Sequence, residues 1–259
     1  MSEPVITAWE AVYPTVSGHQ GRFEMREIVN AILYQSRTGC QRDYLPHDLP
    51  PRSATYYYFA KWREDGIDQT IHDLLRWQVR EKAGRSEDPS LVVLDTQSVH
   101  AAVNVPAATT GKDAANKVPG RRRGLAVDVL GLVIAVAVFA ASVHDNRAGT
   151  VLLDRVVAAD GDRVEGAGRP GVQEHGRRAR CDAGIDVEIV ERNPADRGFV
   201  PQAKRWVVER TYGILMLHRR LVRDYEGRPA SSESRVYWAM TDVIARRLTG
   251  TSTPSWRDA

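Results

Sequence analysis

Two acidic residues lie where a carboxylate would either do chemistry or need a partner. Asp95 directly follows the apolar residues 91–94, which places it on or at the end of a central strand. Glu209 lies in a predicted helix, with Arg205 four residues earlier on the same face. A buried carboxylate needs a cation or hydrogen-bond donors, because burying it alone costs several kcal/mol. Two plainer interpretations stay open: a turn cap for Asp95, and for Glu209 an exposed ion pair worth about 0.3–0.5 kcal/mol.

A basic tract precedes the second expected strand. Its members fall within twelve residues of the chain: Lys112, Lys117, Arg121, Arg122 and Arg123. The common explanation for such a run is a solvated charged loop, and the sharper one is a track that follows the phosphate backbone of a nucleic acid. A carboxylate site nearby would favour the second explanation.

The elements that must position these residues form an α/β pattern after residue 90. In chain order they are a strand buried on both faces at residues 91–94, a hairpin of strands at 124–129 and 132–141 with its turn at Leu130 and Gly131, a helix capped by Asp145, a buried strand at 185–190 and a long helix at about 204–225. This order predicts a sheet flanked by helices.

The preceding part of the chain, residues 20–83, has a helical pattern. Ile28 and Ile32 repeat at a spacing of four, and Gly39 predicts a helix end. Ser53 predicts the N-cap of a second helix, rich in aromatic residues, and a third helix follows. Three short helices with basic and aromatic side chains are typical either of a helix-turn-helix reader of DNA or of a bundle with an aromatic core, and the pattern favours the bundle.

The composition excludes several classes of protein. With 259 residues, 42% apolar and 27% charged, the chain is long enough for one large core or two smaller ones, and collagen-like or wholly disordered chains are excluded. Cys40 and Cys181 lie far apart without a CxxC pair, so neither a disulfide scaffold nor a structural zinc site is expected. The apolar run at 129–142 is too short to cross a bilayer and no leader segment is visible, which predicts a cytoplasmic protein without a membrane partner.

Three blocks of the chain carry a resemblance to a known family: residues 91–99, 120–128 and 205–211. They resemble the DDE-type transposases of bacterial insertion sequences, in the group named after insertion sequence five. The motifs at 44–46 and 56–59 are similar to that group's N-terminal domain. The likeness covers most of the chain, and the order and spacing of its blocks make it specific.

The resemblance implies an RNase H-like mixed sheet flanked by helices and preceded by a small helical domain. It implies a DNA-end-binding domain at residues 1–85 and a catalytic domain at 90–250. In such a catalytic domain two aspartates and a glutamate hold two Mg²⁺ ions, which serve DNA cleavage and strand transfer. Asp95 matches the first aspartate and Glu209 the glutamate.

The resemblance also implies how DNA is bound. Arg205 matches the arginine of the family's tyrosine, arginine, glutamate and lysine signature, whereas Gln202 and Met216 stand at the tyrosine and lysine positions. The expected partners are the terminal inverted repeats of the element and its target DNA, which places the protein at the nucleoid. A homodimer is expected because two ends must be brought together. The residues expected to contact DNA are Lys112, Lys117, Arg121, Arg122, Arg123, Arg205 and Arg210.

The block expected to carry the second aspartate, residues 160–182, departs from the family. It holds five glycines and five arginines but no aromatic residue, leucine or isoleucine, which predicts irregular structure. One back-translation, read one base later, regains Asp, Gly and Phe in the expected order. Our hypothesis is that compensating frame changes scrambled this block, so that Asp160, Asp162 and Asp182 are accidental carboxylates. Asp128, on the neighbouring strand, is not expected to be the missing ligand.

Two functions are therefore compatible with the sequence. One is a transposase that cuts and joins DNA through Asp95 and Glu209. The other is a degenerate relative that binds DNA without cutting it efficiently, because two carboxylates hold Mg²⁺ less well than three.

Overall fold

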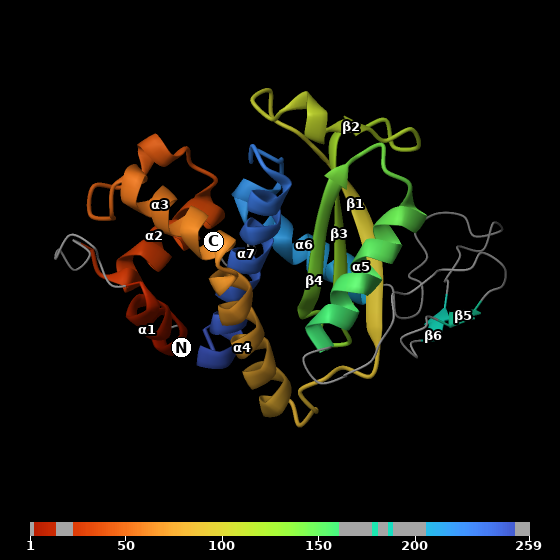
Figure 1. The fold of residues 1–259 in the computed structure, drawn as a ribbon, viewed down its shortest axis with the longest axis horizontal. Coiled ribbons are helices and arrows are strands. Elements are labelled where there is room, and N and C mark those ends of the chain that lie inside the picture. Colours follow the sequence, from red (N-terminus) through yellow and green to blue (C-terminus); the bar gives the residue numbers. More distant parts are fainter. Residues whose placement is uncertain (1–2, 14–22, 161–177, 181–185, 189–205, 252–259) are drawn as a thin grey trace. The chain divides into compact units, whose positions relative to one another are not determined.

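The chain forms two compact units in the computed structural model, which describes residues 3–13, 23–160, 178–180, 186–188 and 206–251 (Figure 1). The helical unit comprises residues 1–87, 101–106 and 214–259, and the sheet unit comprises residues 88–100 and 107–213. The sequence predicts boundaries at 1–85 and 90–250. The difference lies at the C-terminus, whose residues group with the N-terminal helices and not with the sheet.

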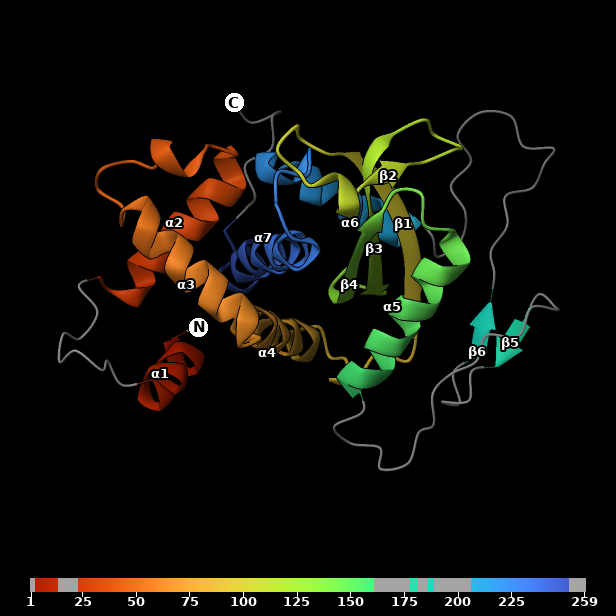
Figure 2. The ribbon, with the colours of Figure 1, turned by 45° about the horizontal axis from the view of Figure 1, so that its top comes forward.

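The helical unit is built from five α-helices and two short 3₁₀ helices among its described residues. They are α1 (Glu3–Val12), α2 (Met25–Thr38), η1 (Arg42–Tyr44), α3 (Arg52–Glu64), α4 (Ile67–Lys82), η4 (Arg219–Leu221) and α7 (Pro229–Thr249). Figure 2 shows α2, α3 and α4 around α7, which contacts each of them. Twelve residues of α7 are buried, so this helix forms the centre of the unit.

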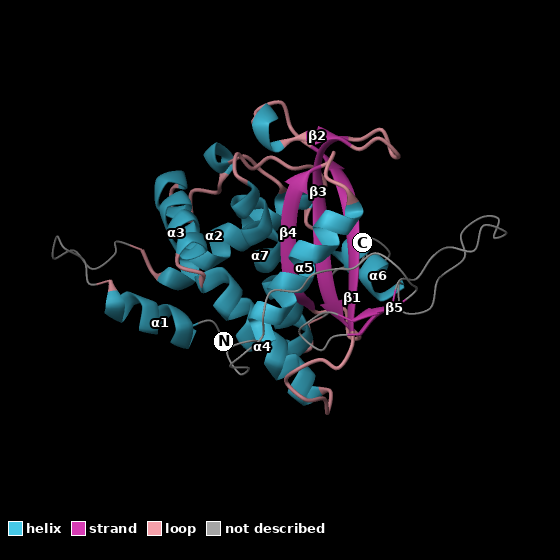
Figure 3. Cartoon of the chain, turned by 45° about the vertical axis from the view of Figure 1, so that its right-hand side comes forward, coloured by secondary structure: helices cyan, strands magenta, loops and turns pink. Residues whose placement is uncertain are grey.

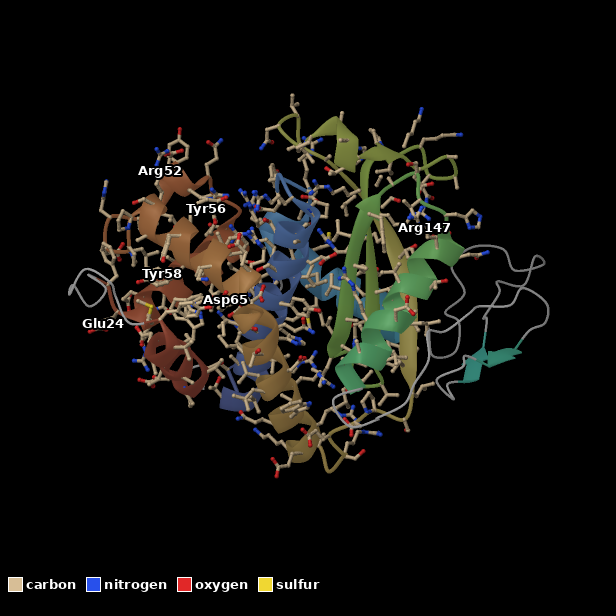
Figure 4. All side chains as sticks on the ribbon, viewed as in Figure 1. Glu24, Arg52, Tyr56, Tyr58, Asp65 and Arg147 are labelled. Carbon is tan, nitrogen blue, oxygen red and sulfur yellow. The ribbon has the colours of Figure 1, made fainter. Side chains whose placement is uncertain are left out.

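Aromatic side chains form much of the helical unit's core. Phe59 and Trp62 of α3 are buried, and the ring of Trp62 lies 5.8 Å from that of Trp238 on α7. Trp9 of α1 donates a 2.8 Å hydrogen bond to Asp65, the residue after α3 that Figure 4 labels. The bundle interpretation is confirmed for Phe59 and Trp62 but not for Tyr56 and Tyr57, which are exposed.

The helix ends of this unit follow the sequence only in part. Gly39 ends α2 as predicted, with a left-handed φ of 72° and its N–H bonded to Gln35 O. The predicted N-cap of α3 is wrong. Pro51 holds that position and Ser53 lies inside the first turn, because Thr55 N bonds to Pro51 O.

The predicted long helix at 204–225 is wrong at its C-terminal end. Helix α6 (Trp206–Met216) stops before His218, whose backbone is extended and whose N–H bonds to the carbonyl three residues earlier. The chain then turns and Pro229 begins α7, a helix that the sequence pattern did not predict.

The sheet unit holds a four-stranded antiparallel sheet, two helices and a small separate hairpin among its described residues (Figure 3). Its elements are β1 (Val92–His100), η2 (Ala107–Thr109), β2 (Gly111–Lys112), β3 (Pro119–Asp128), β4 (Val133–Ala140), α5 (Asp145–Asp160), β5 (Arg178–Arg180), β6 (Asp186–Glu188) and the greater part of α6. Strand β3 pairs with β1, β2 and β4, so it is the central strand.

The hairpin of β3 and β4 is confirmed, with its turn at Leu130 and Gly131. Asp128 Oδ1 accepts hydrogen bonds of 2.9 Å from the N–H groups of Leu130 and Leu132, which closes the turn. Gly131 has a φ of 76°, and a Cβ there would lie 2.9 Å from Thr211 Oγ1 on α6. Glycine is therefore required by both the backbone conformation and the packing of the helix.

Two predicted strand boundaries are wrong in ways that matter for the site. β1 continues to His100, so Asp95 lies within the strand and does not cap a turn after it. β3 begins at Pro119, so Arg121 and its two basic neighbours are strand residues and not part of a loop. The reason is the same for both strands: residues 96–100 of β1 pair with residues 120–124 of β3, beyond the apolar residues that predicted each strand.

Helix α5 covers one face of the sheet (Figure 1). Val156 packs with Ala126 and Ala135, and a Cβ at Gly124 would lie 2.8 Å from Leu152 Cδ1, so this glycine lets the helix approach closely. The predicted cap is shifted by one residue: Asp145 is the first residue of α5, and His144 Nδ1 accepts the N–H of Asn146.

The fold class predicted from the sequence is confirmed as α/β with helices before the strands, consistent with an RNase H-like fold. Two further predictions concern residues that the structure describes only in part. A short strand occurs at 186–188, inside the predicted strand at 185–190, and residues 178–180 form a strand within the block predicted to be irregular. Within the described part of the chain no helix is long and apolar enough to cross a membrane.

Candidate active site

Asp95 lies on the face of the sheet opposite to α5. It pairs with Leu125 of β3, whereas its neighbour Leu94 pairs with Ala126, part of the cluster that α5 covers. Because successive side chains of a strand point to opposite faces, Asp95 shares its face with Leu125. Figures 1 and 2 show α6 on this second face, behind the sheet. Asp95 is half-buried.

Helix α6 is fastened to the backbone beside Asp95. The hydroxyl oxygen of Tyr212 lies 2.9 Å from both Asp95 O and Arg123 O, so its proton binds a backbone carbonyl of β1 or β3. Glu209 lies three residues before Tyr212 on α6, the spacing at which side chains of a helix are neighbours. Tyr212 therefore joins β1, the strand of Asp95, to α6, the helix of Glu209, and does so about one helical turn after Glu209.

Two further hydrogen bonds fix the same helix to the hairpin turn. Thr211 Oγ1 donates to Gly131 O at 3.0 Å, and Arg210 Nη2 donates to Leu130 O at 3.2 Å. Val207 and Val208 are buried, so the helix also has an apolar contact face. These bonds hold α6 in one orientation on the sheet, which sets the position of Glu209.

The pKa of Tyr212 reports on the charges around it. Burial raises this pKa well above the ordinary value of a tyrosine, the negative charge of Asp95 raises it further, and Arg123 lowers it. Tyr212 therefore stays protonated at neutral pH and its hydroxyl remains a hydrogen-bond donor. Asp95 and Arg123 both lie close enough to act on this hydroxyl.

The three arginines of the basic tract are buried. Arg121 donates to Thr109 O at 3.2 Å and to Thr109 Oγ1 at 2.6 Å, and Arg123 lies beside Tyr212. The interpretation of the whole tract as a solvated loop is therefore wrong. Lys112 and Lys117 are exposed, and Lys117 has a positive φ of 59° in the connection between β2 and β3. A contact with phosphate stays a prediction, and the exposed members of the tract are these two lysines.

Arg122 joins three elements of the sheet unit through acidic partners. It binds Asp113 at 3.0 Å, at the end of β2, and it also binds Asp145 of α5. Asp113 accepts a 2.6 Å hydrogen bond from Ser98 of β1, and this bond is the largest of the interactions that lower the pKa of Asp113. Sequence reasoning missed this cluster because its members lie in four different elements.

The remaining predicted residues have various positions. Arg210 is exposed and lies over the ring of Trp206. Asp128 caps the hairpin turn from a position opposite Val92. Arg205, Gln202, Asp162, Asp182 and the side chain of Asp160 lie outside the described residues.

The donor chemistry of this site suits a hard cation only in part. Carboxylate oxygens are the ligands that Mg²⁺ prefers, and Asp95 and Glu209 are the two carboxylates that the resemblance assigns to this role. Among the described residues no three acidic, histidine or cysteine side chains form a group that could hold a metal ion. The block in which the resemblance implies a second aspartate, residues 160–182, lies mostly outside the described residues. The two carboxylates therefore match the type of ligand that Mg²⁺ prefers. The described residues contain no metal-binding group of three that would include them.

Tyr212 is the contributor to this site that sequence reasoning missed. Its position, three residues after Glu209, gives it the spacing of a residue on the buried face of the helix. That signal predicts burial but not the hydrogen bond to the strand.

Comparison with known families gives two matches. A family of transposases of the IS4/5 type matches residues 2–72, and the transposase DDE domain matches residues 86–240. No curated protein and no solved structure is similar enough to match. The DDE domain covers more than half of the 259 residues, and it includes both Asp95 and Glu209. The chain therefore belongs to the DDE transposases, in the IS4-like group.

Proposed function

We propose that this transposase cuts and joins DNA at the ends of its insertion sequence with Asp95 and Glu209 as ligands for Mg²⁺. The observation that carries the proposal is the hydrogen bonding of Tyr212, which fastens the helix that bears Glu209 to the backbone of the strand that bears Asp95. A site that must keep two carboxylates in register needs such a connection, since metal affinity depends on fixed ligand positions.

The chain's own residues prepare this site. Mg²⁺ supplies activation of water or a 3′-hydroxyl and stabilisation of the leaving oxygen at a phosphodiester. Tyr212 holds the strand and the helix together through a proton that it keeps at neutral pH. Arg123 adds a buried positive charge beside that hydroxyl, which offsets part of the acidic charge.

Exposed cations of the sheet unit are the proposed DNA contacts. Lys112, Lys117 and Arg210 are the members of the predicted set that the structure describes as exposed. The proposed DNA partners are the terminal inverted repeats and the target DNA, held by a homodimer that joins two ends. Each lost phosphate contact should flatten the dependence of log K on log salt by about 0.9.

A second candidate function is DNA binding without efficient cutting. It is supported by the sequence of residues 160–182, the block that should carry the second aspartate, because this block departs from the family pattern. Two carboxylates offset less of the charge of two Mg²⁺ ions than three do.

A cleavage assay separates the two functions. The full chain is incubated with DNA from the element's ends, with and without Mg²⁺, and Asp95→Asn and Glu209→Gln are compared with Asp154→Asn. Asp154 is an exposed carboxylate of α5, on the helix that covers the other face of the sheet. We expect each site variant to lower the cleavage rate by more than about 100-fold, since even residues that only support a metal ligand cost 10- to 100-fold.

Three outcomes of this assay decide the assignment. Cleavage that survives both site variants overturns the site. Equal loss in Asp154→Asn points to a general defect of the unit. Mg²⁺-independent binding without any cleavage by the unmodified chain supports the second candidate.

A further inference from the structure

Helix α6 has an open side that the proposed chemistry does not use. Trp206 is 46% exposed, and Arg210 and Gly213 are exposed on the same side of the helix, at spacings of four and three residues. A Cβ added at Gly213 would meet no atom within 4 Å. Glu209 is half-buried at the edge of this strip, between it and the buried side that carries Tyr212.

The ring of Trp206 is held by Arg210. The guanidinium carbon of Arg210 lies 4.8 Å from the ring centroid, a cation–π contact. The same guanidinium donates to Leu130 O at 3.2 Å, which fixes it to the hairpin turn. Within the described part of the chain no other aromatic ring contacts Trp206. The ring is thus pre-ordered by a fixed arginine while nearly half of the residue's surface faces solvent.

An exposed and pre-ordered indole ring next to a cation has the features of a surface that stacks on nucleobases. Proteins that bind single-stranded DNA combine aromatic rings, on which bases stack, with positive charge that follows the backbone. Trp206 supplies the ring and Arg210 supplies the charge, one helical turn apart and adjacent to Glu209 in the chain. A tryptophan that is nearly half exposed loses part of the favourable burial that large aromatic side chains normally contribute.

We propose that Trp206 stacks on an unpaired nucleobase of the DNA strand whose phosphate lies at Asp95 and Glu209. This inference rests on the proposed function and adds a binding residue to it. Every base has a π-face, so stacking on Trp206 tolerates any base at that position. Arg210 acts as a positioning residue, because it holds the ring and faces the negative backbone.

The test measures binding to single-stranded DNA without divalent ions, so that it does not depend on the metal. The full chain is titrated into a labelled dT12 oligonucleotide and, separately, into a 12-base-pair duplex, with fluorescence anisotropy as the readout. Trp206→Ala should weaken binding to dT12 by about 5- to 150-fold, the range measured for loss of one stacked base. Binding to the duplex, which offers no unpaired base, should change less than about 2-fold.

Matched variants keep the test specific. Trp206→Phe retains a ring and should restore most of the affinity for dT12. Tyr225→Ala removes another exposed aromatic ring, which is 36% exposed and in cation–π contact with Arg220, and should leave affinity unchanged. Arg210→Lys keeps the positive charge but not the planar contact with the ring. Its loss of affinity for dT12 should lie between the losses of Trp206→Phe and Trp206→Ala.

The outcomes also separate this inference from the proposed function. Unchanged dT12 affinity in Trp206→Ala overturns the stacking role, and so does a loss that is equal for the duplex. Glu209→Gln should bind dT12 normally while failing to cleave. If Glu209→Gln cleaves normally but Trp206→Ala binds dT12 weakly, the stacking role of Trp206 is supported and the proposed metal site is wrong.

Discussion

Glu226 of the helical unit and the pair Asp95 and Glu209 of the sheet unit are acidic residues in contrasting surroundings. In the helical unit Glu226 is buried and enclosed by arginines, with Arg220 Nε at 3.0 Å, Arg235 Nε at 3.2 Å and Arg42 Nη2 at 3.9 Å from its carboxylate oxygens. In the sheet unit Asp95 and Glu209 are half-buried, on a strand and a helix joined by Tyr212. The enclosed carboxylate of Glu226 ties elements of its unit together, whereas the partial exposure of Asp95 and Glu209 is compatible with their proposed role as metal ligands.

Electrostatics explains why the enclosed glutamate stays charged. Burial raises the pKa of Glu226, but the nearby charges of Arg235, Arg220 and Arg42 lower it by more, so its pKa lies below the ordinary value. Arg235 is itself fully buried and also donates a 2.6 Å hydrogen bond to Gln35. This network ties α2 and α7 to the segment that precedes α7, through charges that are largely buried.

The largest change in stability is expected from a substitution of Glu226, the enclosed carboxylate. Glu226→Gln removes the charge that balances a buried arginine, and it should lower the free energy of unfolding by about 3–5 kcal/mol. Urea unfolding at neutral pH measures the change, with Glu24→Gln, an exposed glutamate before α2, as the control. A loss no larger than that of Glu24→Gln would show that the enclosed network does not stabilise the unit.

A smaller effect is expected at the connection between strand and helix in the sheet unit. Tyr212→Phe removes a donor shared by two backbone carbonyls and should lower the free energy of unfolding by about 1–3 kcal/mol. Cleavage should fall even at temperatures where the variant is fully folded, because Glu209 loses its fixed position. Tyr57→Phe, at a tyrosine 60% exposed, is the control. Full activity of folded Tyr212→Phe would contradict the positioning role.

The smallest expected effect is a pH dependence at Asp113. Hydrogen bonds from Ser98 and from Asn116 hold its pKa below the ordinary value of about 3.9. A carboxyl with a lower pKa in the folded state stabilises the protein above about pH 3.9, and this stabilisation is lost as the pH falls through the folded-state pKa. Asp113→Asn should therefore show a weaker loss of stability between pH 5 and pH 3 in urea unfolding. The same pH dependence in Asp113→Asn and in the unmodified chain would assign the acid sensitivity to other groups.

Local sequence signals predicted the parts of the fold that depend on neighbouring residues. The apolar run before Asp95 identified the first strand, and the Leu130-Gly131 turn identified the hairpin, because turn residues and strand periodicity act over a few positions. Gly39 was identified as a helix end for the same reason.

Long-range packing decided the features that sequence reasoning missed. Three consecutive arginines look like a solvated loop, yet Arg121 and Arg122 are buried in β3, because Thr109 of η2 and Asp145 of α5, 12 and 23 positions away in the chain, accept their hydrogen bonds. The grouping of α7 with α4 likewise depends on contacts between residues more than 150 positions apart. Tyr212 could be predicted to be buried, but not to bond to the strand that carries Asp95.

The acceptor at Asp95 is a main-chain oxygen, and every amino acid offers the same oxygen at that position. Substitution of the Asp95 side chain therefore leaves intact the hydrogen bond between β1 and Tyr212 of α6. With the proposed role of Asp95 as a metal ligand, a single substitution at position 95 should therefore give an inert transposase with an unaltered fold.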